Sequence, residues 1–350
     1  MLPSDSATGL STPVLFIIFN RPESTRQVLQ AIRAARPARL YVAADGPRPG
    51  RPTEAALCAQ VRALVTDHID WPCEVHTRFR ETNLGCGLNP AAAIDWFFEH
   101  EPEGIILEDD CLPSPHFFRF CHELLARYRH DARVMHIGGC NFSREALRPQ
   151  APAADSYYFS GQVQSWGWAS WRRAWQHFDF KLQLLPELRR RRLLGSLYPS
   201  LLERQYWLPR FQAIYKARQA PSIWDYQWHF AVAANSGLTI LPAVNLVCNI
   251  GFGQDATHTT AADEQFARPA AEQFAFPLRH PPAVLRDARR DQQYFREFLS
   301  GRVAAKTRRL LQRVPQWFRE QGSVPLDPPY SPEPEEAPTH ADPAAPFTYS

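Results

Sequence analysis

The stretch Gly104-Ile105-Ile106-Leu107-Glu108-Asp109-Asp110-Cys111 decides the fold that the sequence predicts. Its three branched apolar residues in succession are typical of a short strand that is buried on both faces. Pro113 ends the strand, and Ser114-Pro115 is a typical helix start, followed by apolar residues at helical spacing from 117 to 128. The three acids therefore stand between a buried strand and a helix, where ligands bind in open α/β sheets.

The three adjacent acids predict a cation site. Side chains alternate along an extended chain, so we expect Glu108 and Asp110 to face one way and Asp109 the other. Clustered carboxylates repel one another unless a cation or several hydrogen-bond donors lie among them. Ligands that are all oxygen suit a hard divalent ion, Mn²⁺ or Mg²⁺, bound together with substrate phosphates. The alternative is a solvated acidic turn that binds nothing.

Strands and helices alternate on both sides of this stretch. Apolar runs and periodicity predict strands at 14–19, 40–44, 73–79, 105–107 and 134–138, and helices at 24–35, 53–65, 91–99 and 116–129. This order predicts an α/β fold with a mostly parallel sheet flanked by helices. We expect two halves of one catalytic domain at 12–140 and 141–298, the second a smaller acceptor-side subdomain, then a basic amphipathic helix at 299–321 and a proline-rich disordered tail at 322–350.

Composition narrows the class of protein. A net charge of +3 over 350 residues is too small to indicate nucleic acid as a partner. The seven cysteines are scattered, without a CxxC pair, which favours a reducing, cytoplasmic location over a disulfide framework or a zinc site. The apolar run at 14–19 is too short to span a bilayer. Residues 296–321 mix aromatic and basic side chains, and we expect peripheral contact with the inner face of an anionic membrane, the alternative being a helix packed on the domain.

Three further loops follow predicted strands and carry groups suited to a nucleotide. Asn20-Arg21 offers a fixed cation, Asp45 an acceptor for a base or ribose, and Asn83 with Gly85 a close approach of backbone to ligand. With the acids they predict a nucleotide-diphosphate pocket, although Asp-Gly and Asn-x-Gly are also common turn sequences. The sequence lacks a Walker lysine loop and a GxGxxG after its first strand, which argues against an NTPase or a dehydrogenase.

Asp225 is the candidate general base. It lies in an aromatic segment, 222–229, and between residues 205 and 262 the only other acid is Asp255. Flanking aromatic rings desolvate a carboxylate and raise its pKa toward a useful value. The alternative is an N-cap for a helix at 226–234. Of the three tryptophans that could stack on sugar faces, Trp166, Trp168 and Trp224, we expect two to pack in the core instead.

The order of these motifs resembles a family of GT-A-fold (Rossmann-like) glycosyltransferases. It is similar to the N-acetylglucosaminyltransferase that begins complex N-glycan branching and to its bacterial relatives, often labelled family 2. The resemblance covers roughly residues 12–262 and departs at Tyr226, where the family has a second acid. Its eukaryotic members carry a membrane anchor, and we expect none in this chain. The motifs that carry it are Glu108-Asp109-Asp110 with Pro115-His116-Phe117-Phe118, Gly167-Trp168, Trp224-Asp225, and Phe252-Gly253 with His258.

The resemblance implies a role for each residue. Among the three acids, Asp110 would bind Mn²⁺, Asp109 would lie near the ribose and Glu108 near the donor sugar. Asp45 would contact the uracil, Arg21 the nucleotide, and Asp225 would be the base. His258 would lie in a loop over the diphosphate or form a structural hydrogen bond. It implies an inverting, metal-dependent transfer from a UDP-sugar to a hydroxyl of a glycan or lipid-linked acceptor of the bacterial cell envelope. Two alternatives stay open: a sugar-nucleotide nucleotidyltransferase, and an inactive nucleotide-sugar-binding module used for surface interaction.

Overall fold

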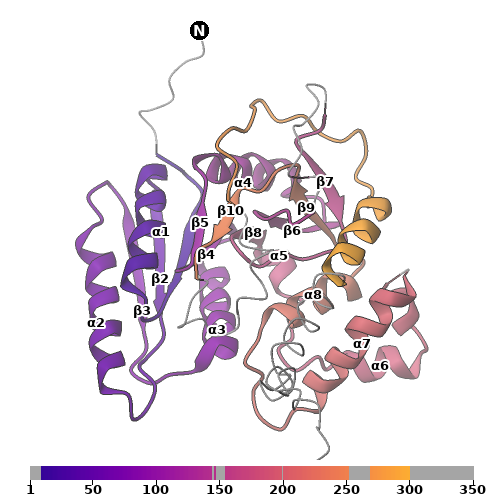
Figure 1. Cartoon of the computed structure of the whole chain (residues 1–350), viewed down its shortest axis with the longest axis horizontal. Coiled ribbons are helices and arrows are strands. Elements are labelled where there is room, and N and C mark those ends of the chain that lie inside the picture. Colours follow the sequence, from indigo (N-terminus) through magenta and orange to yellow (C-terminus); the bar gives the residue numbers. More distant parts are fainter. Residues whose placement is uncertain (1–8, 144–145, 147–153, 199, 252–268, 300–350) are drawn as a thin grey trace, which may run out of the picture. The chain divides into compact units, whose positions relative to one another are not determined.

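The computed structural model describes residues 9–143, 146, 154–198, 200–251 and 269–299. Their main element is an eight-stranded sheet in the order β3-β2-β1-β4-β8-β6-β9-β7 (Figure 1). The strands are β1 (Val14–Ile18), β2 (Arg39–Ala44), β3 (Glu74–Phe79), β4 (Glu103–Glu108), β6 (Val134–Gly138), β7 (Tyr157–Ser160), β8 (Trp168–Trp171) and β9 (Leu238–Pro242). Only β8 and β7 run against the other six, so the predicted mostly parallel α/β sheet is confirmed.

A second, two-stranded sheet pairs β5 (Cys111–Pro113) with β10 (Val247–Asn249) in antiparallel fashion. The helices are α1 (Pro22–Ala35), α2 (Pro52–Asp67), α3 (Gly85–His100), α4 (Pro115–Tyr128), α5 (Arg172–Trp175), α6 (Leu185–Arg190), the 3-10 turn η2 (Leu194–Ser196), α7 (Leu201–Lys216) and α8 (Asp225–Ala234). A further helix covers residues 288–299. Among the described residues, no helix has the length and apolar character needed to cross a bilayer.

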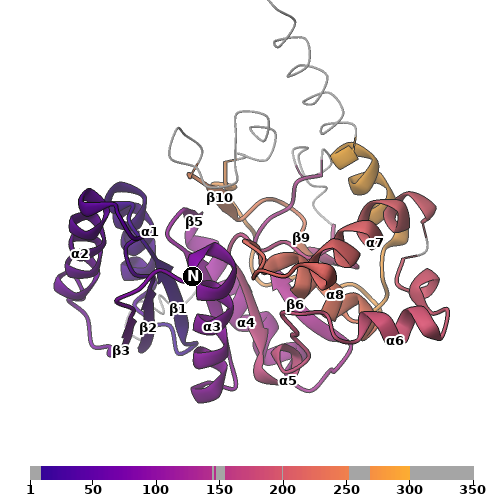
Figure 2. The same ribbon diagram turned by 90° about the horizontal axis from the view of Figure 1, so that it is seen from below.

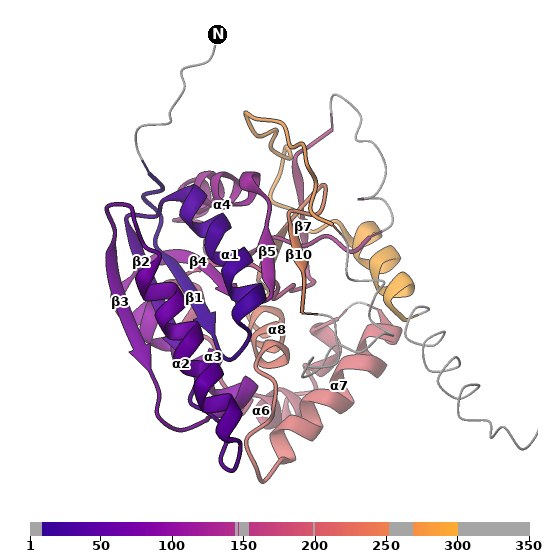
Figure 3. The same cartoon turned by 60° about the vertical axis from the view of Figure 1, so that its left-hand side comes forward.

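The alternation of side chains along β1 explains why the sheet is covered on both faces. Val14, Phe16 and Ile18 pack in one cluster with α1, α2 and α4, whereas Leu15 and Ile17 pack in another with α3, α5 and α8. Figure 3 shows α1 and α2 in front of β1, β2 and β3. The five β1 side chains are at most 5% exposed, as the continuous apolar run predicts.

A third apolar cluster joins α6, α7, α8 and the helix at 288–299 at the end of the sheet away from α1 and α2 (Figures 1 and 2). Phe295 is 2% exposed in this cluster, and Phe298 packs against it. These contacts agree with a helix packed on the domain, the alternative to membrane contact, and the predicted membrane contact of 296–321 stays a prediction. Residues 300–321 lie outside the described residues.

The sheet order places a switch of direction between β1 and β4. From β1 the chain proceeds to β2 and β3 on one side, and then returns to β4 on the other side of β1. Loops that leave the carboxyl ends of β1 and β4 diverge to opposite sides, which leaves a crevice between them. The loops with Arg21 and with the three acids border this crevice.

Candidate active site

The acids after β4 meet the loop after β1. Ile17 pairs with Glu108 across the two parallel strands. Beyond this pair, the backbone N–H of Phe19 donates to Asp109 Oδ2 over 2.9 Å. Arg21 Nη1 donates to Asp110 Oδ2 over 2.9 Å and lies 3.5 Å from Asp109 Oδ1. One guanidinium thus contacts two of the three carboxylates.

The predicted alternation of the three acids is wrong. β4 ends at Glu108, and the chain turns at Asp109-Asp110 before β5. Because the turn rotates the backbone, Asp109 faces the same side as its neighbours, and all three acids line one cavity of about 420 Å³. The predicted alternation holds only in an extended strand, and the strand ends at Glu108, one residue before Asp109.

The charged forms of the three acids repel one another, and their protein partners offset this repulsion only in part. Burial, followed by the charges of Asp110 and Asp109, raises the pKa of Glu108 well above its usual value, and Asp225 adds to the effect. Burial and the Asp110 charge raise the pKa of Asp109 to about 7, against the opposing effects of Arg21 and the Phe19 N–H. Burial lowers the pKa of Arg21, but the acids outweigh it and raise that pKa overall. The cluster therefore favours a further cation.

The residues present fit a divalent ion only if a substrate supplies most of its ligands. Within the described ranges, no group of three or more histidine, cysteine, aspartate or glutamate side chains is placed to hold a metal by itself. Mg²⁺ commonly binds through one or two carboxylates, with substrate phosphates and water as the other ligands. The excess negative charge around Asp110 is compatible with such a site.

Asp45 is held by the start of α3. Its Oδ1 accepts from the N–H groups of Gly46 and Leu84, and its Oδ2 accepts from Gly85 N–H and from Asn83 Nδ2, all over 2.9–3.0 Å. Burial raises the pKa of Asp45, and the three backbone donors oppose this rise. Four donors use the lone pairs of one carboxylate, so Asp45 shapes the cavity wall and has no acceptor position left for a base in this conformation.

The contacts of Asp45 explain why α3 begins earlier than the sequence predicts. The sequence predicts a helix from residue 91, but α3 begins at Gly85, with φ +82°. The first N–H groups of a helix need acceptors from outside it, and Asp45 accepts the Gly85 N–H. The helix end therefore borders the cavity directly, and Cys86, Asn89 and Pro90 join its wall, which the sequence does not predict.

Eight of the predicted site residues line this first cavity: Arg21, Asp45, Asn83, Gly85, Glu108, Asp109, Asp110 and Asp225. Asn20 is not among the described lining residues, because its Nδ2 donates to Glu54 Oε1 over 3.0 Å. Glu54 also binds Arg48, whose backbone N–H donates to Oε2 over 2.7 Å. Arg48 lines the cavity and was missed, since it lies further along the loop after β2 than Asp45 and belongs to no motif. His258 lies outside the described residues.

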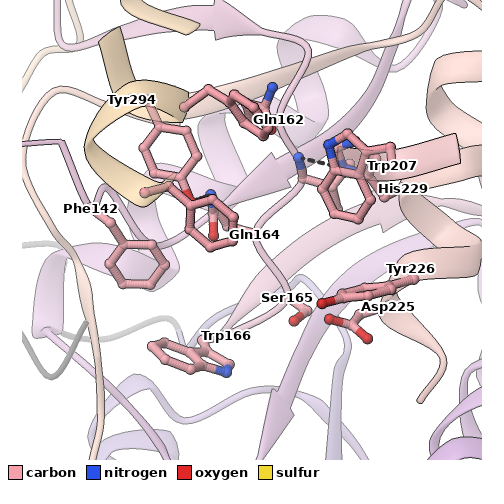
Figure 4. A pocket seen from close by; sticks show the side chains of 13 residues that line it. Phe142, Gln162, Gln164, Ser165, Trp166, Trp207, Asp225, Tyr226, His229 and Tyr294 are labelled. Carbon is pink, nitrogen blue, oxygen red and sulfur yellow. Dashed lines mark hydrogen bonds between the residues drawn. The ribbon is translucent and has the colours of Figure 1, made fainter. Parts of the chain in front are cut away.

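Asp225 is the first residue of α8. The N-cap position is Trp224, and no side chain caps it, so the alternative interpretation of Asp225 as the N-cap is wrong. Asp225 lines the first cavity and also a second one of about 220 Å³. Among the described lining residues, Trp166 is the other one common to both, and Figure 4 shows Trp166 and Asp225 in the second cavity. Trp168 and Trp224 are at most 4% exposed in the core, as expected for two of the three tryptophans.

Comparisons with known proteins identify no family for this chain. No family model matches the chain, and no curated protein matches its sequence. Among solved structures, mouse xyloside xylosyltransferase 1 in its apo form is similar at 10% identity with a TM-score of 0.33, over 64% of this chain and 82% of that one. HddC from Yersinia pseudotuberculosis is similar at 10% identity with a TM-score of 0.30, over 50% of this chain and 86% of that one.

Proposed function

We propose that the chain is an inverting glycosyltransferase that moves a sugar from a nucleotide-diphosphate sugar, with UDP-sugar as the expected donor, to a hydroxyl acceptor. The observation that carries the proposal is the position of Asp225, which lines both cavities. A carboxylate in that place faces a donor in the first cavity and an acceptor in the second. Trp166 forms the rest of the shared wall.

The reaction needs a proton acceptor at this wall. The acceptor oxygen attacks the anomeric carbon and forms the new C–O bond, while the bond from that carbon to the diphosphate oxygen breaks and its electron pair leaves with the diphosphate. The hydroxyl proton passes to Asp225. General base catalysis of this kind typically contributes about 10²–10⁴-fold.

The first cavity suits the leaving diphosphate because it holds two fixed cations, Arg21 and Arg48, beside an acid cluster that can attract a metal ion. Arg21 is fixed by Asp110 and Asp109, and Arg48 is fixed by Glu54. Asp110 would hold Mn²⁺ or Mg²⁺ together with diphosphate oxygens, and the bound ion supplies positive charge to the leaving group. Arg21 stays within the same cluster and orients the Asp110 carboxylate. Fixed charges lower the energy of a developing anion because they need no reorganisation during reaction.

Donor hydrolysis tests the proposal without knowledge of the acceptor. Purified protein is incubated with Mn²⁺ and, one at a time, UDP-, GDP- and dTDP-sugars, and release of the nucleoside diphosphate is measured. Slow release from one donor, abolished by chelation of the metal and by Asp110→Asn, supports the proposal. Absence of release and of binding for every donor would count against it.

A further inference from the structure

The second cavity contains two buried N–H groups that have no hydrogen-bond partner in the structure. They are His229 Nε2 and Trp207 Nε1, from side chains in residues that are 3% and 8% exposed. The two rings stack with centroids 4.1 Å apart and an interplanar angle of 20°. Both line the cavity (Figure 4). A buried donor without a partner is unfavourable, so a ligand oxygen that accepts from it strengthens binding.

The protonation state of His229 follows from its neighbours. The backbone N–H of Val163 donates to His229 Nδ1 over 3.4 Å, so the proton of the neutral ring is on Nε2. Burial, helped by the charges of Arg286 and His136, lowers the pKa of His229 to about 3. The ring is therefore a neutral hydrogen-bond donor at physiological pH, and it brings no positive charge to the cavity wall.

The remaining described lining is polar but without cations. The side chains of Gln162 and Gln164 contribute amides, and Trp166 contributes an aromatic face. The described part of the wall contains no lysine or arginine, and its one carboxylate is Asp225. An anionic ligand would find repulsion from Asp225 and no counter-charge, whereas a sugar ring offers hydroxyls to the donors and a C–H face to the indole.

An ion pair between the half-buried Arg286 and the buried Asp291 holds the wall in place. Asp291, which is 2% exposed, accepts from Gly161 N–H over 2.8 Å and pairs with Arg286. This fixes the helix at 288–299 against the segment that contains Gln164, whose Nε2 donates to Tyr294 Oη over 2.9 Å. The cavity is thus formed before any ligand arrives, which lowers the entropic cost of binding.

We propose that the second cavity binds the acceptor, and that it selects a neutral, hydroxyl-bearing sugar ring whose oxygens accept from His229 Nε2 and Trp207 Nε1. The inference rests on the proposed function, because Asp225 in the shared wall is the group that takes the acceptor proton. A volume of about 220 Å³ suits a single ring and is smaller than the roughly 300–1,000 Å³ of sites for drug-sized ligands.

Matched pairs of small acceptors test the charge selectivity. The donor that shows hydrolysis is combined with methyl glucoside or methyl glucuronide, and with methyl galactoside or methyl galacturonide, and binding is followed by saturation-transfer NMR and transfer by product formation. We expect at least one neutral member to bind, and to bind at least about tenfold more tightly than its uronide, because the uronide carboxylate and Asp225 repel each other. A uronide that binds as well as its neutral partner would overturn the inference, as would no binding of any neutral glycoside up to about 10 mM.

Trp207→Phe tests the donor assignment. It removes the N–H and keeps an aromatic ring, and we expect the neutral glycoside to bind about three- to tenfold more weakly, the loss of one hydrogen bond, with the change on acceptor KM rather than donor KM. Trp71→Phe is the matched control, since Trp71 donates to Pro37 O within the core beside α1 and α2, and acceptor binding should stay at the wild-type value. Equal acceptor affinity in Trp207→Phe and wild type would refute the assignment. If the wild-type protein hydrolyses no donor, the result would instead count against the proposed function.

Discussion

His136 gives the structure a specific sensitivity to acid. The ring lies on β6 with no exposed surface, and Trp228 Nε1 donates to its Nδ1 over 3.1 Å. Since an indole N–H only donates, the proton of the neutral ring is on Nε2, which donates to the carbonyl of Gln164 over 2.9 Å. A second proton on Nδ1 would set two N–H groups against each other in a dry core. Burial accordingly lowers the pKa of His136 to about 3, against the effect of the Gln164 carbonyl.

The sign and size of the effect follow from linkage. The unfolded chain protonates this histidine below about pH 6.5, whereas the folded chain does so only near pH 3, so stability present above pH 6.5 is lost as the pH falls. At about 1.4 kcal/mol per unit at most, His136 alone accounts for a loss of about 2–3 kcal/mol between pH 6.5 and 4.5. If the His136 ring left this position, the Gln164 carbonyl in the wall of the second cavity would lose its hydrogen bond.

His136→Gln provides the measurement. Glutamine keeps one acceptor and one donor but does not titrate in this range. Urea unfolding at pH 6.5 and at 4.5 gives the free energy of unfolding of both proteins, and contributions from other groups cancel in the difference. We expect the advantage of wild type over the variant to shrink by about 2–3 kcal/mol at the lower pH. His130→Gln, at an exposed position, is the control and should follow wild type. Parallel pH dependences of wild type and His136→Gln would refute the reasoning.

Three further predictions concern the site. Asp225→Asn should lower turnover by about two or more orders of magnitude with nucleotide affinity unchanged, measured by initial rates and calorimetry; retention of more than about a tenth of wild-type turnover would exclude the base role. Asp110→Asn should abolish metal-dependent binding of UDP, while the melting temperature without metal stays near wild type, because Arg21 keeps its contact with Asp109 and one repulsive charge is lost; an early melt with normal Mn²⁺-dependent binding would contradict it. Gly251→Ala places a Cβ against Asp110 Oδ2 and should weaken nucleotide binding without removing any acid, whereas wild-type affinity would show that this carboxylate is free to move.

The sequence predicts the frame of the site better than the orientation of its side chains. The buried strand at Ile105–Leu107 and the apolar run of β1 are local patterns, so the parallel sheet and the acids at its edge were predictable. Asn20 and Asp45 follow their strands as predicted, but tertiary donors and acceptors turn their side chains toward Glu54 and toward the start of α3. Such partners are distant in sequence and leave no local signal.

The second cavity shows the same limit more clearly. Its walls come from segments around residues 142, 162–166, 207, 225–229 and 294–298, which no periodicity connects. Trp207 and His229 are ordinary members of apolar helices in the sequence. Only the folded arrangement shows that each keeps a buried N–H without a partner beside Asp225.

Chromatographic analysis of one reaction mixture tests the central claim most directly. The protein is incubated with Mg²⁺, UDP-sugars and pyrophosphate, and the uridine nucleotides formed are separated by anion exchange. A transferase forms UDP together with free or transferred sugar, and we predict UDP as the product, lost in Asp225→Asn and in Asp110→Asn. Formation of UTP with sugar 1-phosphate would contradict the account and identify a nucleotidyltransferase instead.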